Sequence, residues 1–192
     1  MSKRDRSKQN IFVTGFSGTG KSTTSLIVAT TLGWEFIDMD QEITQQTSKT
    51  IESIFREEGE SRFRDLENNV LRRICALNCQ VVSTGGGVGV DKRNLGLMKN
   101  NGFVVCLEAT PQTIHRRLTA QLANGGDSVI RPMLSEKNPL DRIVSLKNER
   151  QSSYSLANWT VYTDEMTPDE VSREVIREWK SYRQTKTPEV PM

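Results

Sequence analysis

The chain has 192 residues, a length that one hydrophobic core can serve, so we expect a single domain over residues 1–192. Lys and Arg number 26 against 24 Asp and Glu, and this balance gives no general attraction to nucleic acid or to an anionic membrane. The three cysteines form no C-x-x-C pair, which favours a reduced compartment, and no run of about 18 apolar residues occurs. We therefore expect a monomeric, cytoplasmic protein; a plastid protein with a trimmed transit segment is the alternative.

Short apolar runs alternate with helical patterns along the whole chain. The runs predict strands, and apolar residues recurring every three or four positions predict helices. A Thr-Pro-Asp-Glu cap at 167–170 marks the start of the last helix. In chain order the pattern predicts strands at 11–13, 36–37, 81–83, 103–107 and 159–162, and helices at 22–32, around Ile43, at 50–56, 60–77, 110–122 and 140–154, and from 168.

Strands that alternate with helices indicate right-handed βαβ units and an α/β sheet covered on both faces. The stretch between 123 and 139 is rich in Gly, Asn, Ser and Pro and predicts a lid at about 119–136. We expect residues 1–9 and 183–192 to be flexible.

A phosphate-binding loop is the most specific motif in the chain. Gly15 to Ser22 fits G-x-x-x-x-G-K-S and lies between a predicted strand and a predicted helix, as the motif requires. Glycines let backbone N–H groups surround phosphate oxygens, Lys21 reaches the outer phosphates and Ser22 is placed to hold Mg²⁺. The nucleotide-binding residues that this predicts are Gly15, Ser17, Gly18, Thr19, Gly20, Lys21, Ser22 and Thr23.

Such a loop also occurs in GTPases and in translocating ATPases, so it does not fix the reaction. The chain has no N-K-x-D guanine-reading motif, and the predicted strand 81–83 does not end in an aspartate. The carboxylates Asp38 and Asp40 follow another predicted strand, at the edge where α/β sheets bind ligands. The alternative for this pair is a helix cap at Asp40 and a solvated turn at Asp38.

Further motifs follow in an order that resembles the shikimate kinase family. Phe63 to Glu67 matches F-R-x-x-E, Gly85 to Gly87 is a G-G-G run, and Arg131 to Leu134 matches R-P-L-L with one change. Together with Asp38-x-Asp40 and a late Arg150, they span Gly15 to about Tyr154.

The resemblance implies a P-loop three-layer sandwich with a five-stranded parallel sheet, a lid and an acceptor-binding helical region at about 40–70. It implies transfer of the ATP γ-phosphoryl group to the 3-hydroxyl of shikimate, a step towards chorismate and the aromatic amino acids. The implied roles are catalysis by Lys21, Asp40 and Arg131, with Arg131 also closing over the nucleotide; Mg²⁺ binding by Ser22 and Asp38; and shikimate binding by Asp40, Arg64, Gly85, Gly86, Gly87 and Arg150.

Two departures and two alternatives stand beside this interpretation. The predicted lid is longer than the family's usual one, and residues 151–153 are Gln-Ser-Ser where Asn-Pro-Leu is common. Arg116 or Arg117 is a guess for adenine contact, with a solvated helix face as the alternative. The chain could phosphorylate another small acceptor, such as a sugar acid or a nucleoside monophosphate, or keep the fold for binding without catalysis.

Overall fold

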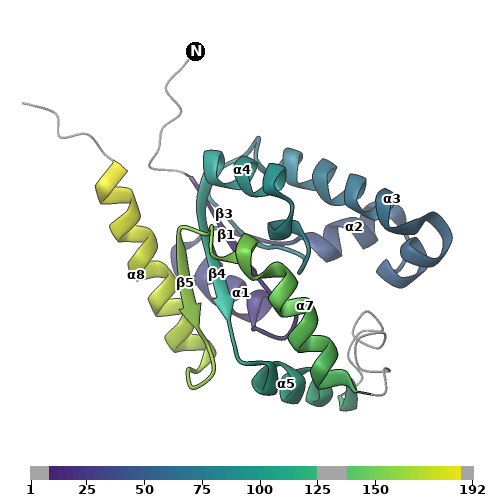
Figure 1. Ribbon diagram of the computed structural model, residues 1–192. Helices are drawn as coiled ribbons and strands as arrows, with labels where there is room; N and C mark the ends of the chain where they lie inside the picture. Colours follow the sequence, from purple (N-terminus) through teal and green to yellow (C-terminus); the bar gives the residue numbers. More distant parts are fainter. Residues whose placement is uncertain (1–8, 125–137, 187–192) are drawn as a thin grey trace, which may run out of the picture.

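The computed structural model describes residues 9–124 and 138–186, and these form an α/β sandwich around one five-stranded sheet (Figure 1). All strand pairs are parallel, in the order β2-β3-β1-β4-β5. This confirms the predicted fold class and all five predicted strands. The strands are β1 (Asn10–Gly15), β2 (Glu35–Asp38), β3 (Gln80–Ser83), β4 (Gly102–Glu108) and β5 (Trp159–Tyr162).

Helices follow almost every strand, as the parallel connections require. The first turn of α2 has a side-chain cap from Asp38, α3 from Thr50 and α5 from Thr110. The helices are α1 (Lys21–Leu32), α2 (Met39–Thr47), α3 (Ile51–Ile74), α4 (Lys92–Asn101), α5 (Pro111–Ala123), α7 (Pro139–Tyr154) and α8 (Pro168–Lys186), with a 3₁₀ turn η2 (Val88–Val90). None of the described helices is long and apolar enough to cross a bilayer.

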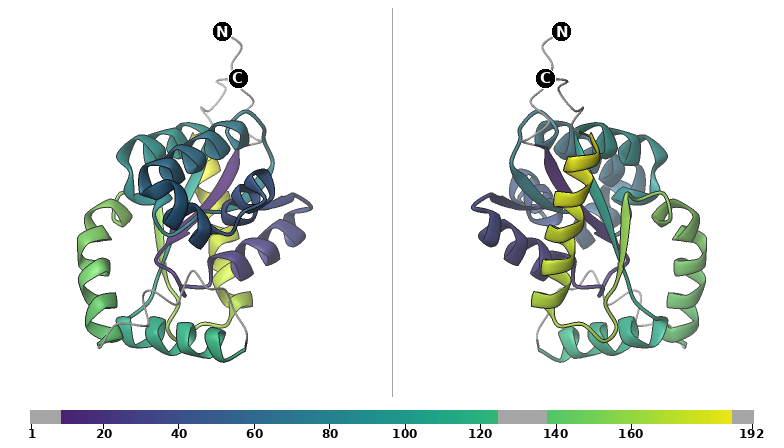
Figure 2. Two further views of the ribbon diagram at one scale, coloured as in Figure 1. Left: turned by 90° about the vertical axis from the view of Figure 1, so that its right-hand side faces the viewer. Right: turned by 90° about the vertical axis from the view of Figure 1, so that its left-hand side faces the viewer.

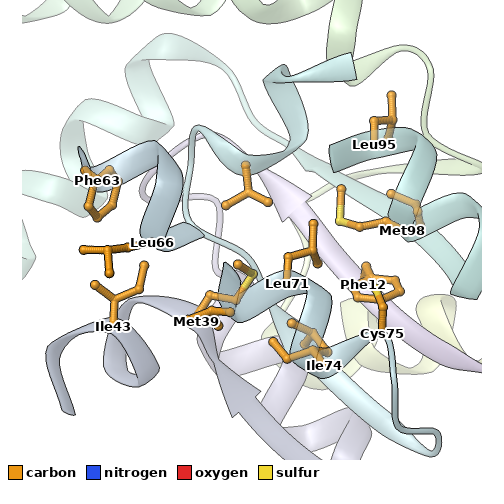
Figure 3. Packing of buried hydrophobic residues seen from close by; sticks show 14 of the residues in the cluster. Phe12, Met39, Ile43, Phe63, Leu66, Leu71, Ile74, Cys75, Leu95 and Met98 are labelled. Atoms are coloured by element: carbon orange, nitrogen blue, oxygen red, sulfur yellow. The ribbon is translucent and has the colours of Figure 1, made fainter. Parts of the chain in front are cut away.

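Successive residues of the central strand β1 point into two separate cores. Phe12 packs on one face of the sheet with α2, α3 and α4, as Figure 3 shows for Met39, Leu71 and Met98. Ile11 and Val13 pack on the other face, which α1 and α8 cover (Figure 2). Because β1 is buried on both faces it has a continuous apolar sequence, which is how it was predicted.

A third cluster closes the carboxyl end of the sheet. Phe16 of the phosphate loop and Cys106 of β4 pack there against Ile114 of α5 and Ile143 of α7. This cluster fixes α5 and α7 beside the phosphate loop and so shapes one side of the site.

Several predicted boundaries were wrong. The sequence did not predict α4, because its buried apolar residues are only Leu95 and Met98, which lie on either side of an exposed Gly96. Helix α3 has a non-helical Gly59 (φ 82°, ψ 171°), which agrees with the two helices predicted at 50–56 and 60–77, but it ends at Ile74, three residues before the predicted end.

Helix α8 continues to Lys186, so residues 183–186, which belong to the stretch expected to be flexible, are helical. Helix α5 reaches Ala123, so helix occupies the first residues of the predicted lid. The rest of that lid, from 125 to 136, lies outside the described residues, as do residues 1–8 and 187–192.

Candidate active site

The phosphate loop leaves β1 in a conformation that depends on two glycines. Gly15 has φ 135°, and a Cβ there would lie 2.2 Å from the carbonyl oxygen of Leu107. Gly20 is the N-cap of α1 with φ 94°, so the loop turns directly into a helix N-terminus. Backbone N–H groups and the positive end of α1 therefore face the same place, which suits an anion.

Lys21 stands over this loop and is its cationic side chain. Its Nζ donates a hydrogen bond to the carbonyl oxygen of Phe16 at 2.9 Å. Burial lowers the pKa of the Lys21 ammonium, and the carboxylates of Asp40 and Asp38 act in the opposite direction. Phosphate oxygens would replace the carbonyl as partner and favour the charged form of the lysine.

A set of oxygen ligands lies beside the start of α1. Ser22 Oγ donates to Asp38 Oδ2 at 2.7 Å and lies 3.1 Å from Ser83 Oγ at the end of β3. Asp38 Oδ1 accepts from the backbone N–H groups of Asp40 and Gln41, so Asp38 is the N-cap of α2. The cap anticipated at Asp40 therefore belongs to Asp38, which uses one oxygen as a cap and presents the other to Ser22.

Asp40 lies in the first turn of α2 and faces the glycine run. A methyl group at Gly85 would lie 2.8 Å from Asp40 Oδ1 and 3.2 Å from Glu67 Oε1. The two carboxylates therefore share the space that Gly85 leaves open. Nothing larger than glycine fits there without moving them.

Arg64 is held by two glutamates beside the last glycine of the run. Its Nη1 donates to Glu67 Oε2 at 2.7 Å, and its Nη2 donates to Glu60 Oε1 at 2.8 Å. A Cβ at Gly87 would lie 2.3 Å from Arg64 Nη1. The guanidinium therefore occupies the space above Gly87, with the side chain 37% exposed and able to meet a ligand.

Glu67 is a buried acid of the site with a strongly shifted pKa. Its side chain is 1% exposed, and Oε1 has no hydrogen-bond partner among the described residues. Burial raises the pKa of Glu67 to about 7, although the ion pair with Arg64 acts to lower it. A pKa in this range links the charge of Glu67, the neighbour of Asp40, to pH near neutrality.

Arg150 reaches the same glycine run from α7. Its Nη1 donates to the carbonyl oxygen of Gly86 at 3.3 Å, and its guanidinium lies 5.3 Å from the centre of the Phe16 ring. Tyr154 Oη donates to the same carbonyl at 2.8 Å, and burial raises the pKa of Tyr154 to about 12, which keeps it a neutral donor. Two donors from one helix thus fix the position of Gly86.

Arg117 joins the phosphate loop to the end of β5. Its Nη1 donates to Thr163 Oγ1 at 2.9 Å and to the carbonyl oxygen of Gly18 at 3.5 Å, and its Nη2 donates to the carbonyl oxygen of Thr163 at 2.6 Å. Of the two arginines considered for adenine contact, only Arg117 has contacts with the loop, since Arg116 is exposed.

The structure brings the predicted residues together in two groups. Asp40, Arg64 and Arg150 converge on Gly85–Gly87, and Ser17 of the loop lies next to Gly86. Ser22 and Asp38 are in contact, whereas Thr23 lies exposed in the first turn of α1. Arg131 lies outside the described residues.

Sequence reasoning did not assign roles to Ser83, Glu67 or Tyr154. Glu67 was recognised only as part of F-R-x-x-E, and its spacing of three from Arg64 on a predicted helix was a usable signal. Ser83 and Tyr154 give no such signal, because their contacts depend on strand order and on the packing of α7.

The fold and this site define a P-loop phosphotransferase, with Asp40, Arg64 and Arg150 grouped around Gly85–Gly87 beside the phosphate loop. A family model described as shikimate kinase matches residues 17–180. A curated shikimate kinase of Thermodesulfovibrio yellowstonii is 37% identical over 179 residues, 93% of this chain and 99% of that protein. One of Sulfurihydrogenibium sp. is 39% identical over 90% of this chain and 98% of that protein.

Solved structures agree with these sequence comparisons. A shikimate kinase from Acinetobacter baumannii in complex with shikimate superimposes with a TM-score of 0.81 and 30% identity, covering 95% of this chain and 98% of that one. A gluconokinase from Sinorhizobium meliloti, at 14% identity and a TM-score of 0.55, shares the fold alone. The chain belongs to the shikimate kinase family, so the predicted resemblance is confirmed.

Proposed function

We propose that this protein transfers the γ-phosphoryl group of ATP to the 3-hydroxyl of shikimate, giving shikimate 3-phosphate and ADP. The observation that carries the proposal is the convergence of Asp40, Arg64 and Arg150 on the run Gly85–Gly87, beside the phosphate loop. One carboxylate and two guanidinium groups suit an acceptor with hydroxyls at one end and a carboxylate at the other.

The acceptor carboxylate pairs with the arginines in this proposal. A guanidinium offers two parallel donors that match a carboxylate, and Arg64 and Arg150 come from separate helices, α3 and α7. Glu67 and Glu60 hold Arg64 in place, and the Phe16 ring supports Arg150. The two cations are thereby oriented before the acceptor arrives, which reduces the cost of binding.

Asp40 acts on the attacking hydroxyl. The hydroxyl oxygen forms a bond to the γ-phosphorus, the bond from that phosphorus to the bridging oxygen of ADP breaks, and the hydroxyl proton passes to the Asp40 carboxylate. Lys21 and the N-terminus of α1 stabilise the charge on the phosphates during this transfer. Closure over the nucleotide by Arg131, outside the described residues, stays a prediction from the sequence.

The ligands of a Mg²⁺ ion in this proposal are Ser22 and, through water, Asp38. Both present oxygen atoms, the ligand type that Mg²⁺ prefers, and they lie at the phosphate end of the site. Residues 9–124 and 138–186 contain no group of three or more His, Cys, Asp or Glu that could hold a metal. In this proposal the nucleotide phosphates supply further ligands, and the ion when bound would neutralise phosphate charge.

The test is ADP release by the purified protein with ATP and Mg²⁺, with shikimate, gluconate, AMP, CMP or no acceptor. We expect release that depends on shikimate. ADP release with another acceptor alone would make that acceptor the substrate in place of shikimate. Shikimate binding without ADP release would indicate a binding protein. A monomeric state, a cytoplasmic location and a single domain over residues 1–192 stay predictions.

A further inference from the structure

A second polar cleft lies outside the acceptor pocket, between α3 and α4. These helices lie side by side on one face of the sheet (Figures 1 and 2), and the cleft between them has a volume of about 700 Å³. This volume falls in the range of small-molecule sites. Its lining includes none of Asp40, Gly85–Gly87 or Arg150, and of the proposed acceptor-binding residues it shares Arg64 alone.

The lining is rich in cations and amides. Five of the thirteen lining residues are Arg or Lys, two are Asp and four are Asn. Three of the cations already have acidic partners, since Arg62 pairs with Glu58, Arg64 with Glu60 and Glu67, and Arg93 with Asp91. Among the described lining residues, the two cations without an acidic partner are Arg72 and Lys92, one on each wall.

The floor of the cleft is fixed by a chain of hydrogen bonds. Arg72 Nε donates to Asn68 Oδ1 at 2.8 Å, and Asn68 Nδ2 donates to Asn94 Oδ1 at 2.7 Å, with Asn94 4% exposed. Within the described part of the chain, the Nη nitrogens of Arg72 and the Lys92 ammonium have no partner. Both side chains are exposed, so a ligand can reach these donors. The Asp65 carboxylate also lines the cleft and can accept hydrogen bonds from hydroxyls.

We propose that the cleft between α3 and α4 binds a small hydroxylated anion, of the sugar phosphate or hydroxy acid type. The anionic group would lie between Arg72 and Lys92. The planar guanidinium of the one and the ammonium of the other can both donate hydrogen bonds to a phosphate or carboxylate. The hydroxyls would bond to the asparagine amides and to Asp65. The polar lining excludes an apolar ligand.

Arg64 connects this cleft with the acceptor pocket. It lines the cleft, and its guanidinium also lies above Gly87 in the pocket. An anion in the cleft attracts that guanidinium away from Gly87, so occupancy should weaken acceptor binding. This coupling rests on the proposed function, whereas binding in the cleft does not.

The binding test is calorimetric titration with glucose 6-phosphate of protein loaded with ADP and Mg²⁺, which keeps the phosphate loop occupied. We expect the double variant Arg72→Gln/Lys92→Gln to bind roughly tenfold more weakly than the parent. Arg73→Gln is the matched control, because Arg73 is exposed on the same helix and pairs with Glu42 away from the cleft. Neutral glucose should not bind.

Three results would overturn the cleft as a site. They are no binding of glucose 6-phosphate to the parent, equal affinity in the double variant, or loss of binding in Arg150→Ala, which would place the ligand in the acceptor pocket. For the coupling, glucose 6-phosphate should raise the shikimate KM of the parent more than that of the double variant. An equal rise overturns the coupling, whereas absent shikimate turnover with intact calorimetric binding rejects the proposed function alone.

Discussion

The three consecutive glycines at 85–87 each leave room for a different side chain of the site. A Cβ would meet Asp40 at Gly85, Ser17 at Gly86 and Arg64 at Gly87. None of the three has the positive φ that favours glycine. The glycines are therefore needed for space and not for backbone conformation, and alanine at each should displace one functional group.

Of the three alanine substitutions, Gly87→Ala places its new methyl group closest to a side chain of the site. The new methyl group would lie 2.3 Å from Arg64 Nη1, the flexible end of a side chain, so we expect the fold to persist and the guanidinium to move. The shikimate KM should rise roughly tenfold, the amount that loss of one charge-assisted contact gives, with the ATP KM unchanged. Steady-state kinetics with each substrate varied measures both.

Gly96→Ala is the control for the glycine substitution. Gly96 lies within α4 with no atom within 4 Å of a Cβ, so alanine there should raise helix stability slightly and leave both KM values alone. An unchanged shikimate KM in Gly87→Ala would show that Arg64 does not contact the acceptor from its position above Gly87.

Glu67 should make the stability of the protein depend on pH near neutrality. Its pKa is about 7 in the folded chain against an ordinary 4.5, so the folded state holds the proton more tightly than the unfolded state. Its contribution to stability is complete below pH 4.5 and is lost as pH rises through about 7. The loss is roughly 3 kcal/mol at most, and Glu67→Gln should abolish it.

Urea unfolding at several pH values between 4.5 and 8 measures this dependence. The difference in free energy of unfolding between Glu67→Gln and the parent should widen in favour of the variant as pH rises. Glu60→Gln is the control, because Glu60 also pairs with Arg64 but its side chain is 67% exposed. Parallel pH curves for Glu67→Gln and the parent would mean that the carboxyl is not buried as described.

At the scale of elements, one buried ion pair joins α7 to the sheet. Lys147 of α7 pairs with Glu108 at the end of β4, with side chains 15% and 4% exposed. Lys147 Nζ donates to Glu108 Oε2, whereas Oε1 has no hydrogen-bond partner among the described residues, so Lys147 is the cation paired with this buried carboxylate. Arg150 follows one turn later on α7, so the pair also helps to place the arginine that we propose binds the acceptor.

Lys147→Met should lower the free energy of unfolding by about 3 kcal/mol, because it leaves a buried carboxylate without its cation. Adding Glu108→Gln to that variant should restore part of the loss, since it removes the unpaired charge. The control is Arg177→Met, which breaks an exposed pair on α8 and should cost less than about 1 kcal/mol. Chemical denaturation measures the free energy of unfolding of all three variants. An equal loss in Lys147→Met and Arg177→Met would contradict a stabilising role for the buried Lys147–Glu108 pair.

The sequence predicted elements well where the apolar pattern is dense and poorly where it is sparse. Strand β4 has seven consecutive buried residues and α5 has a threonine cap followed by proline, so both were found nearly to the residue. Helix α4 buries few apolar side chains and was missed, although its wall forms half of the cleft proposed above. A helix that lines a polar surface buries few apolar side chains, so its sequence has little hydrophobic periodicity from which to predict it.

At the scale of the whole molecule, strand order brings the site together. In the order β2-β3-β1-β4-β5, the strands ending at Asp38, Ser83 and Gly15 are neighbours, so three distant segments meet at one sheet edge. The sequence identified the loop and the aspartates as separate motifs, and a family resemblance joined them. The contact of Ser22 with Ser83 could not be predicted, because it depends on β3 lying beside β1.

Nucleotide binding should stabilise the whole fold, because the phosphate loop takes its shape only when β1, α1 and the third core cluster are packed together. A ligand that binds the folded state alone adds about 2.7 kcal/mol at a hundred times its Kd. For a chain of this size that corresponds to a rise in Tm of roughly 5–10 °C. ADP with Mg²⁺ should produce it, EDTA should reduce it, and Lys21→Ala should lose most of it, whereas Lys180→Ala on the exposed side of α8 should keep it. Thermal unfolding followed by circular dichroism measures the shift, and an equal shift in Lys21→Ala would mean that the nucleotide binds elsewhere.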